Sequence, residues 1–81
     1  MTKLPRDLSA SVLVERLRRL GYSVVRQHGS HMTLFTAEHG GHRAWVPKHN
    51  PIAPGTLSSV LKDIAAHFSI NVDELRAKLG L

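Results

Sequence analysis

The sequence predicts an α+β fold of order α-β-β-β-α, in which two helices cover one face of a three-stranded antiparallel sheet and a short extra helix follows at the C-terminal end. Apolar residues recur at helical spacing on both sides of the central segment, which indicates two helices with one buried stripe each. In the central segment, short runs of alternating character are separated by glycine-containing turns, which is typical of hairpin-connected strands. A chain of 81 residues suffices for one small domain, so we expect residues 1–81 to share one core.

The first helix is predicted to begin after Ser9 and to end before Gly21. Serine is a preferred N-cap residue, and glycine readily takes the left-handed conformation that follows a helix end. Leu8 is expected to pack on Leu13 as a hydrophobic staple at the start of this helix. The predicted buried face consists of residues at helical spacing: Ala10, Leu13, Leu17 and Leu20.

Three strands are expected over residues 22–27, 30–36 and 42–47. They are separated by one turn at residues 28–29 and by a second turn at residues 38–41. The second turn contains two adjacent glycines, which can take the positive φ that a tight hairpin requires. These short connections predict antiparallel pairing of neighbouring strands.

Each strand contributes side chains to both faces of the sheet, because successive side chains alternate. The apolar positions share one face, which we expect to lie under the helices: Met32, Leu34, Ala44 and Val46. The remaining positions share the other face, which we expect to be uncovered: His31, Thr33, Phe35, Arg43 and Trp45. This assignment places one imidazole where a large substrate can reach it.

A loop over residues 48–54, restricted by its prolines, leads to a second helix that is expected to begin between residues 54 and 56. Its apolar stripe consists of Leu57, Val60, Leu61, Ile64, Ala65 and Phe68. Asn71 and Glu74 are expected to form a capping box before a short last helix, which Gly80 ends.

The composition excludes several classes of function. The chain has no cysteine, which removes disulfides, thiolate zinc sites and cysteine nucleophiles together. Its apolar runs are far shorter than the roughly 18 residues of a membrane span, and no apolar stretch follows the first basic residues as in a secretory signal. We therefore expect a cytoplasmic protein without membrane contact. The formal net charge of +5 favours a polyanionic partner, nucleic acid first.

The six histidines raise the question of a metal site. The spacings His28-x-x-His31 and His39-x-x-His42 resemble those of metal ligands, but zinc usually takes three or four ligands and Glu38 is the acid nearest to them. Positions three apart around a turn need not converge, and most such histidines are ordinary surface side chains. We expect no metal ion, and we expect no organic cofactor because so small a domain has no room to enclose one.

His31 is the residue best placed for chemistry, because it follows Gly29 and Ser30 directly after the predicted turn. An imidazole exchanges protons near neutral pH. RNA carries its own nucleophile, the 2′-hydroxyl, so an RNA-cleaving site needs only a proton acceptor, a proton donor and positive charge beside the phosphate. On spacing alone, a solvated strand histidine remains the common alternative. The basic side chains expected to neutralise the phosphate are Arg26, Arg43 and Lys48.

The order and spacing of short motifs along the chain resemble those of one family. The motifs are Leu4-Pro5-Arg6, Leu20-Gly21-Tyr22, Gly29-Ser30-His31, Pro47-Lys48-His49 and Pro54-Gly55-Thr56-Leu57. Together they resemble the HicA toxin family, also called YcfA-like, and the likeness covers almost the full chain.

The resemblance implies a fold like that of a double-stranded-RNA-binding domain and the activity of an mRNA interferase, a ribosome-independent endoribonuclease of a type II toxin–antitoxin pair. The catalytic histidine of the family's Gly-Ser/Thr-His motif corresponds to His31, with Ser30 beside it. The family's Pro-x-His motif corresponds to Pro47, Lys48 and His49, which we expect to contribute to RNA binding. The implied partners are mRNA and a HicB-type antitoxin that screens the active site, with no cofactor.

Two other functions remain open at this point. The same basic face would also bind double-stranded RNA without cleaving it, through shape, phosphates and 2′-hydroxyls. Phe35 and Trp45 would serve as apolar anchors for a protein partner, which is compatible with a toxin because an antitoxin has to cover this face. Shortened RNA products would distinguish a nuclease from a binding module.

Overall fold

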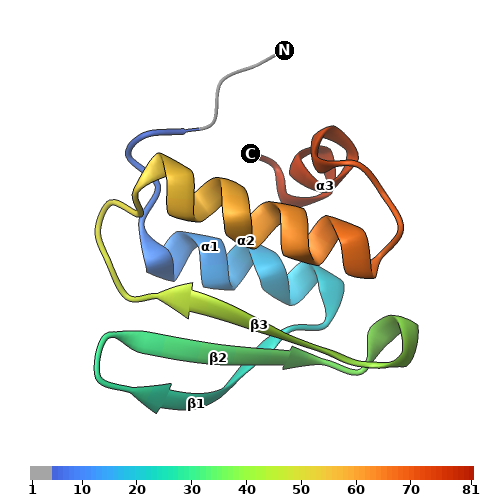
Figure 1. Cartoon of the computed structure of the whole chain (residues 1–81), viewed down its shortest axis with the longest axis horizontal. Coiled ribbons are helices and arrows are strands. Elements are labelled where there is room, and N and C mark those ends of the chain that lie inside the picture. Colours follow the sequence, from blue (N-terminus) through green and yellow to red (C-terminus); the bar gives the residue numbers. More distant parts are fainter. Residues whose placement is uncertain (1–4) are drawn as a thin grey trace.

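The computed structural model of the protein describes residues 5–81 and has the expected α+β architecture (Figure 1). Two helices, α1 (Ala10–Leu17) and α2 (Pro54–His67), lie side by side on one face of a three-stranded sheet. A third helix, α3 (Val72–Leu79), packs against α2. The predicted order α-β-β-β-α with a short C-terminal helix is therefore confirmed. Within residues 5–81, no helix combines the length and the apolar character needed to cross a membrane.

The sheet has the strand order β1-β2-β3, and both pairs of neighbours are antiparallel. β1 spans Ser23–His28, β2 spans His31–Thr36 and β3 spans His42–Pro47. A 3₁₀ helix, η1 (Arg18–Leu20), leads from α1 to β1, and a second one, η2 (Glu38–Gly40), joins β2 to β3. The three connections from α1 to β1, from β1 to β2 and from β2 to β3 are short, so elements that are neighbours in sequence are also neighbours in space.

The two faces of the sheet divide as the alternation predicts. The residues buried under the helices are Met32, Leu34, Ala44 and Val46, and Thr36 is buried on the same face. On the other face, Thr33 is half-buried and the exposed residues are His31, Phe35, Arg43 and Trp45. The helices in residues 5–81 leave this second face open, as Figure 1 shows.

The core extends beyond the helix stripes into the loop that follows β3. Ile52 is fully buried there, and its N–H donates to the Leu8 carbonyl at 2.8 Å. The sequence did not predict this contribution, because one isoleucine among prolines has no periodicity. Leu20 and Phe68, which were expected on the buried stripes, are only partly buried because each lies beyond the last residue of its α-helix.

The first hairpin turn differs from the prediction by one residue. Gly29 and Ser30 form the turn, and His28 remains in β1, where it pairs with His31. Gly29 has a φ of +59°, a conformation that glycine adopts without a steric penalty. The turn is therefore set by the position of the glycine, and both flanking strands meet it one residue later than expected.

The predicted helix ends are confirmed. The Ser9 hydroxyl accepts a backbone N–H from the first turn of α1 at 3.2 Å, and the Asn71 side chain accepts the Glu74 N–H at 2.7 Å. Gly21 and Gly80 both take the left-handed conformation, with φ of +85° and +70°. These local contacts determine where α1 with η1 and α3 stop and start.

Candidate active site

His31 stands at the tip of the first hairpin, directly after the turn. Its backbone pairs with His28 of β1 on one side and with Pro47 of β3 on the other. Its side chain is exposed on the face of the sheet away from the helices, as predicted. The ring of Trp45 lies against the imidazole, with ring centroids 4.9 Å apart and an angle of 60° between the planes. The indole ring therefore restricts one side of the imidazole and leaves it accessible to a large substrate.

Two side chains of β1 share this face with His31. His28 is its direct partner across the hairpin, and Arg26 pairs with Thr33, the next position of β2 on the same face. Side chains of directly opposed residues in an antiparallel pair project to the same face, with Cβ atoms about 5 Å apart. Because His28 and Arg26 are both exposed, the tip carries two imidazoles and one guanidinium at neighbouring positions.

A β-bulge at Val25 determines which side chains of β1 lie on the open face of the sheet. Val24 pairs with Leu34 and Arg26 pairs with Thr33, so the residue between them has no partner on β2. Without the bulge, alternation would place Val24 and Arg26 on the same face. The extra residue turns Arg26 toward the open face and also explains why the alternation in this strand is weak.

The basic residue Arg43 does not reach the hairpin tip. It pairs with Phe35, which lies four residues along β2 from His31. At about 3.3 Å per strand residue, this separation is about 13 Å along the sheet. Arg43 is exposed on the predicted face, but it belongs to the far end of that face.

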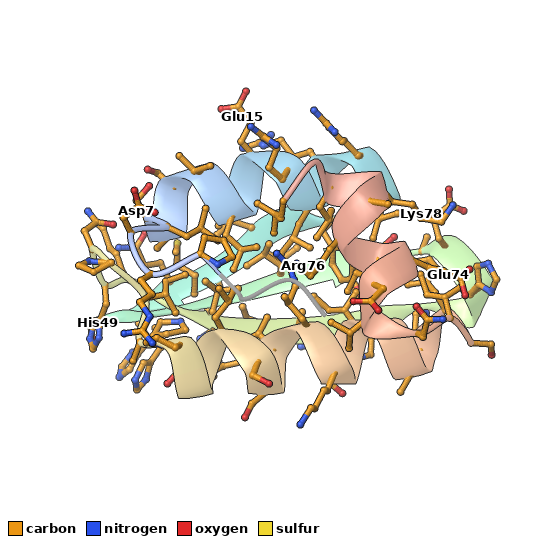
Figure 2. All side chains as sticks on the ribbon, turned by 90° about the horizontal axis from the view of Figure 1, so that it is seen from above. Asp7, Glu15, His49, Glu74, Arg76 and Lys78 are labelled. Atoms are coloured by element: carbon orange, nitrogen blue, oxygen red, sulfur yellow. The ribbon has the colours of Figure 1, made fainter. Side chains whose placement is uncertain are left out.

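Lys48 and His49 follow β3 at the end of the molecule where α1 and α2 begin, and Figure 2 shows His49 there. The Lys48 N–H donates to the Ser30 carbonyl at 2.6 Å, which holds this loop against the hairpin turn. Lys48 is among the residues that line a surface pocket of about 300 Å³, together with Ala10 and Val14 of α1 and Met32 of the sheet. The His49 carbonyl accepts the Ala10 N–H at 3.2 Å, and its side chain is exposed. Lys48 therefore lies behind the tip, whereas the His31 ring lies in front of it.

The backbone at this end of the molecule adds positive potential. Helices α1 and α2 both begin here, and neither has an acidic residue in its first turn. A helix start carries a partial positive charge from the helix dipole. At α1, the Ala10 and Val12 N–H groups already donate to the His49 carbonyl and the Ser9 hydroxyl. Together with the net charge of +5, this arrangement favours an anionic ligand near the tip.

The histidine spacings that resemble metal motifs have another structural meaning. Among residues 5–81, no group of three or more His, Cys, Asp or Glu side chains is arranged to hold a metal ion. His28 and His31 instead flank a turn of two residues and form the pair next to it. A spacing of three around a glycine-containing turn is compatible with this pairing, but it does not determine which two residues form the turn.

The sequence model of one protein family, the HicA toxin of bacterial toxin–antitoxin systems, matches residues 10–65 of the chain. The chain belongs to the HicA toxin family. It is therefore the toxin of a toxin–antitoxin system. The matched segment contains His31 and all the residues expected to bind RNA, and it ends before α3. Searches of curated proteins and of solved structures gave no match. Leu4, in the first of the motifs that carry the resemblance, lies outside the described residues.

The toxin has a second polar cluster at the opposite end of β2 and β3, which the sequence did not predict. The Tyr22 hydroxyl and His42 Nδ1 are 2.7 Å apart, and His42 Nε2 is 3.3 Å from a carboxylate oxygen of Asp63. The His67 ring stacks on His42 with centroids 4.6 Å apart, and its Nε2 is 2.9 Å from the Glu38 carbonyl. Burial, with a smaller contribution from Asp63, raises the pKa of Tyr22 to about 12. These contacts join four segments, which are the residue before β1, η2, β3 and α2, at the end of the sheet remote from His31.

Proposed function

We propose that this HicA-family toxin is an endoribonuclease that cleaves mRNA without a metal ion and uses His31 for proton transfer. The observation that carries the proposal is the exposed imidazole of His31 on an open sheet face, with the Arg26 guanidinium at a neighbouring position of that face. The family membership supports it, since the predicted site lies within the matched segment.

Cleavage of RNA by its own 2′-hydroxyl requires only proton transfer and positive charge from the protein. When the 2′-hydroxyl of RNA attacks the neighbouring phosphorus, a base takes its proton and an acid protonates the leaving 5′-oxygen. One positioned acid or base accelerates such a step by about 10²–10⁴-fold. Positive charge next to the phosphate stabilises the negative charge that builds up on its oxygens. An exposed site on a small protein can therefore support this reaction.

The RNA-binding side chains have different proposed roles that follow from their positions. Arg26 shares the face of His31 and is proposed to contact the reacting phosphate. Ser30 in the turn, whose carbonyl accepts the Lys48 N–H, is proposed with Lys48 and His49 to hold nucleotides that flank the cleaved bond. Arg43 is proposed to contact RNA further along the sheet, because its strand position is remote from His31.

The same face is proposed to bind a HicB-type antitoxin. Phe35 and Trp45 are 37% and 48% exposed, which is unusual for such large apolar side chains and is typical of protein interfaces. Because the Trp45 ring contacts His31, a partner seated on Trp45 would also cover the imidazole. Inhibition would then require no change in the fold of the toxin.

Substitution of His31 by alanine tests the proposal. We expect His31→Ala to lower the rate of RNA cleavage at least 10²-fold, because the reaction loses a proton-transfer group. The measurement is the length of labelled RNA after incubation with purified protein. His39→Asn is the matched control, since it removes an exposed histidine at the other end of the sheet where asparagine tolerates the positive φ. Equal cleavage by His31→Ala and parent would contradict the assignment, and a shifted full-length band with parent protein would indicate binding alone.

Removal of metal ions tests the second part of the proposal. We expect cleavage by the parent protein to continue in excess EDTA at an unchanged rate, because imidazole and guanidinium groups supply the acid, the base and the charge. Loss of cleavage in EDTA that zinc or manganese restores would contradict a metal-independent mechanism.

A further inference from the structure

We propose that His28 is a second catalytic residue, which exchanges a proton with RNA in the same reaction as His31. The inference rests on the proposed ribonuclease function and adds a named residue to it. It comes from strand register, because no motif of the sequence singled out His28 as a partner for His31.

The register places the two imidazoles together. His28 is the last residue of β1 and His31 is the first of β2, and they are direct partners across the hairpin. Their side chains therefore project to the same open face from Cβ atoms about 5 Å apart. Both residues are exposed, so the rings can turn toward a phosphate that lies over the hairpin tip.

The turn between them keeps this distance short. Gly29 and Ser30 close the hairpin, and Ser30 is anchored from behind because its carbonyl accepts the Lys48 N–H at 2.6 Å. On the other side of His31, the ring of Trp45 occupies the neighbouring position. The side of the imidazole toward β1 is the side where His28 lies, so a substrate phosphate there would meet both rings.

Cleavage of RNA needs two proton transfers, and this pair supplies both. The bond that forms joins the 2′-oxygen to phosphorus, and the bond that breaks joins phosphorus to the 5′-oxygen. One imidazole takes the proton of the 2′-hydroxyl while the other, protonated, gives its proton to the leaving 5′-oxygen. The products are a 2′,3′-cyclic phosphate and a 5′-hydroxyl, and the two imidazoles end with their protonation states exchanged.

The other ionisable groups around the tip fit this reaction less well. They are Arg26 on β1, which faces the same side, and Lys48 and His49 in the loop after β3. Arginine and lysine stay protonated at neutral pH, so they neutralise charge and do not exchange protons. His49 is not part of the sheet, and no strand pairing places its ring beside His31.

The first experiment compares rates over a pH series on a short RNA that the parent protein cleaves. The parent should show a bell-shaped profile, because one imidazole must be neutral and the other protonated. His28→Ala should cleave about 10²–10⁴-fold more slowly and lose one limb of the bell. His39→Asn should retain both limbs, and thermal unfolding should show that His28→Ala is folded. If His28→Ala keeps the bell shape and the rate of the parent, the inference is wrong even though the ribonuclease proposal stands.

The second experiment separates acid from base. In a substrate whose leaving 5′-oxygen is replaced by sulfur, the leaving group departs without a proton. The variant that lacks the acid, either His28→Ala or His31→Ala, should recover to within about tenfold of the parent on this substrate, and the variant that lacks the base should not. Recovery of one of the two variants supports the pair. Recovery of neither would show that these imidazoles do not divide the two proton transfers, and no cleavage by the parent would instead overturn the proposed function.

Discussion

The six histidines form two sets of three at opposite ends of the central strands. His28, His31 and His49 lie at the hairpin tip and are exposed, whereas the rings of His39, His42 and His67 contact one another or their neighbours around Tyr22 and Phe68. The same residue type therefore has two physical roles here. The exposed imidazoles at the tip are accessible to a substrate, whereas the half-buried rings of His42 and His67 join η2, β3 and α2 by hydrogen bonds and ring stacking.

The buried tyrosine predicts a loss of stability in alkaline solution. The pKa of Tyr22 is raised from 10.0 to about 12 in the folded protein, so the folded state retains a proton that the unfolded state loses first. The resulting stabilisation is complete below pH 10 and disappears between about pH 10 and pH 12. We expect the free energy of unfolding to fall by up to about 3 kcal/mol over this range.

Tyrosinate absorbance provides a direct measurement, because Tyr22 is the one tyrosine of the chain. Denaturant unfolding of parent and Tyr22→Phe at each pH isolates its contribution from that of lysine residues. The variant should be less stable at neutral pH and should show a shallower decline above pH 10. Titration of the tyrosine near pH 10 in the folded protein would contradict the explanation.

At the scale of elements, three segments distant in sequence meet at the hairpin tip. The turn after β1 accepts a hydrogen bond from Lys48 through the Ser30 carbonyl, and the loop after β3 binds the start of α1 through the His49 carbonyl and the Asn50 side chain. Each of these hydrogen bonds is formed by backbone atoms or by one short side chain, so together they restrain the position of the loop. The position of His31 therefore depends on the path of this loop as well as on the hairpin itself.

A pair of glycine substitutions tests how much the turn conformation contributes. Gly29 and Gly55 both have open space where a Cβ would be added, but only Gly29 has a positive φ. We expect Gly29→Ala to lower the free energy of unfolding by about 1 kcal/mol, because an L-residue is strained in the left-handed region. Gly55→Ala, in the first turn of α2, should raise it by up to about 1 kcal/mol because alanine favours helix.

Thermal or urea unfolding of the two variants measures both changes. Because neither added methyl group meets another atom within 4 Å, the difference between the variants reports backbone conformation alone. Equal stability of the two variants would show that the turn does not depend on glycine.

At the scale of the whole molecule, charge and layering act together. The helices cover one face of the sheet, and the other face remains open with His28, His31 and Arg26 at one end and Arg43 at the other. The formal net charge of +5 attracts a polyanion to the molecule from a distance, and the open face is accessible to it. Recognition of RNA by such a surface should depend strongly on ionic strength.

The salt dependence of RNA binding should report the number of phosphate contacts. For single-stranded RNA, the slope of log K against log salt is about −0.7 for each phosphate neutralised. In a His31→Ala background that prevents cleavage, we expect Arg26→Ala to make this slope shallower by about 0.7. Lys62→Ala, on the exposed side of α2, removes the same charge far from the proposed face and should leave the slope unchanged. An unchanged slope in the Arg26 variant would contradict its proposed phosphate contact.

The local pattern of the sequence by itself determined the fold class, the helix caps and the two faces of the sheet. These features depend on residues a few positions apart, such as Ser9 with the first turn of α1 or Met32 with Leu34 on one strand face. It also predicted that His31 is exposed on the open face, because alternation along a six-residue strand is a local property. The predicted hairpin turn was wrong by one residue because Gly29, which has a positive φ, is the first residue of the turn and not the second.

Only the tertiary structure decided which distant residues meet. The pairing of His28 with His31 requires a turn at residues 29–30, one residue later than predicted. The placement of Arg26 depends on the bulge at Val25. Lys48 lies at the pocket behind the hairpin tip because the path of the loop after β3 places it there. The contact of Tyr22, which precedes β1, with His42 of β3 likewise joins residues that are distant in sequence. Periodicity records which way a side chain points along one element, whereas register and loop path arise from packing between elements, which no short stretch of sequence encodes.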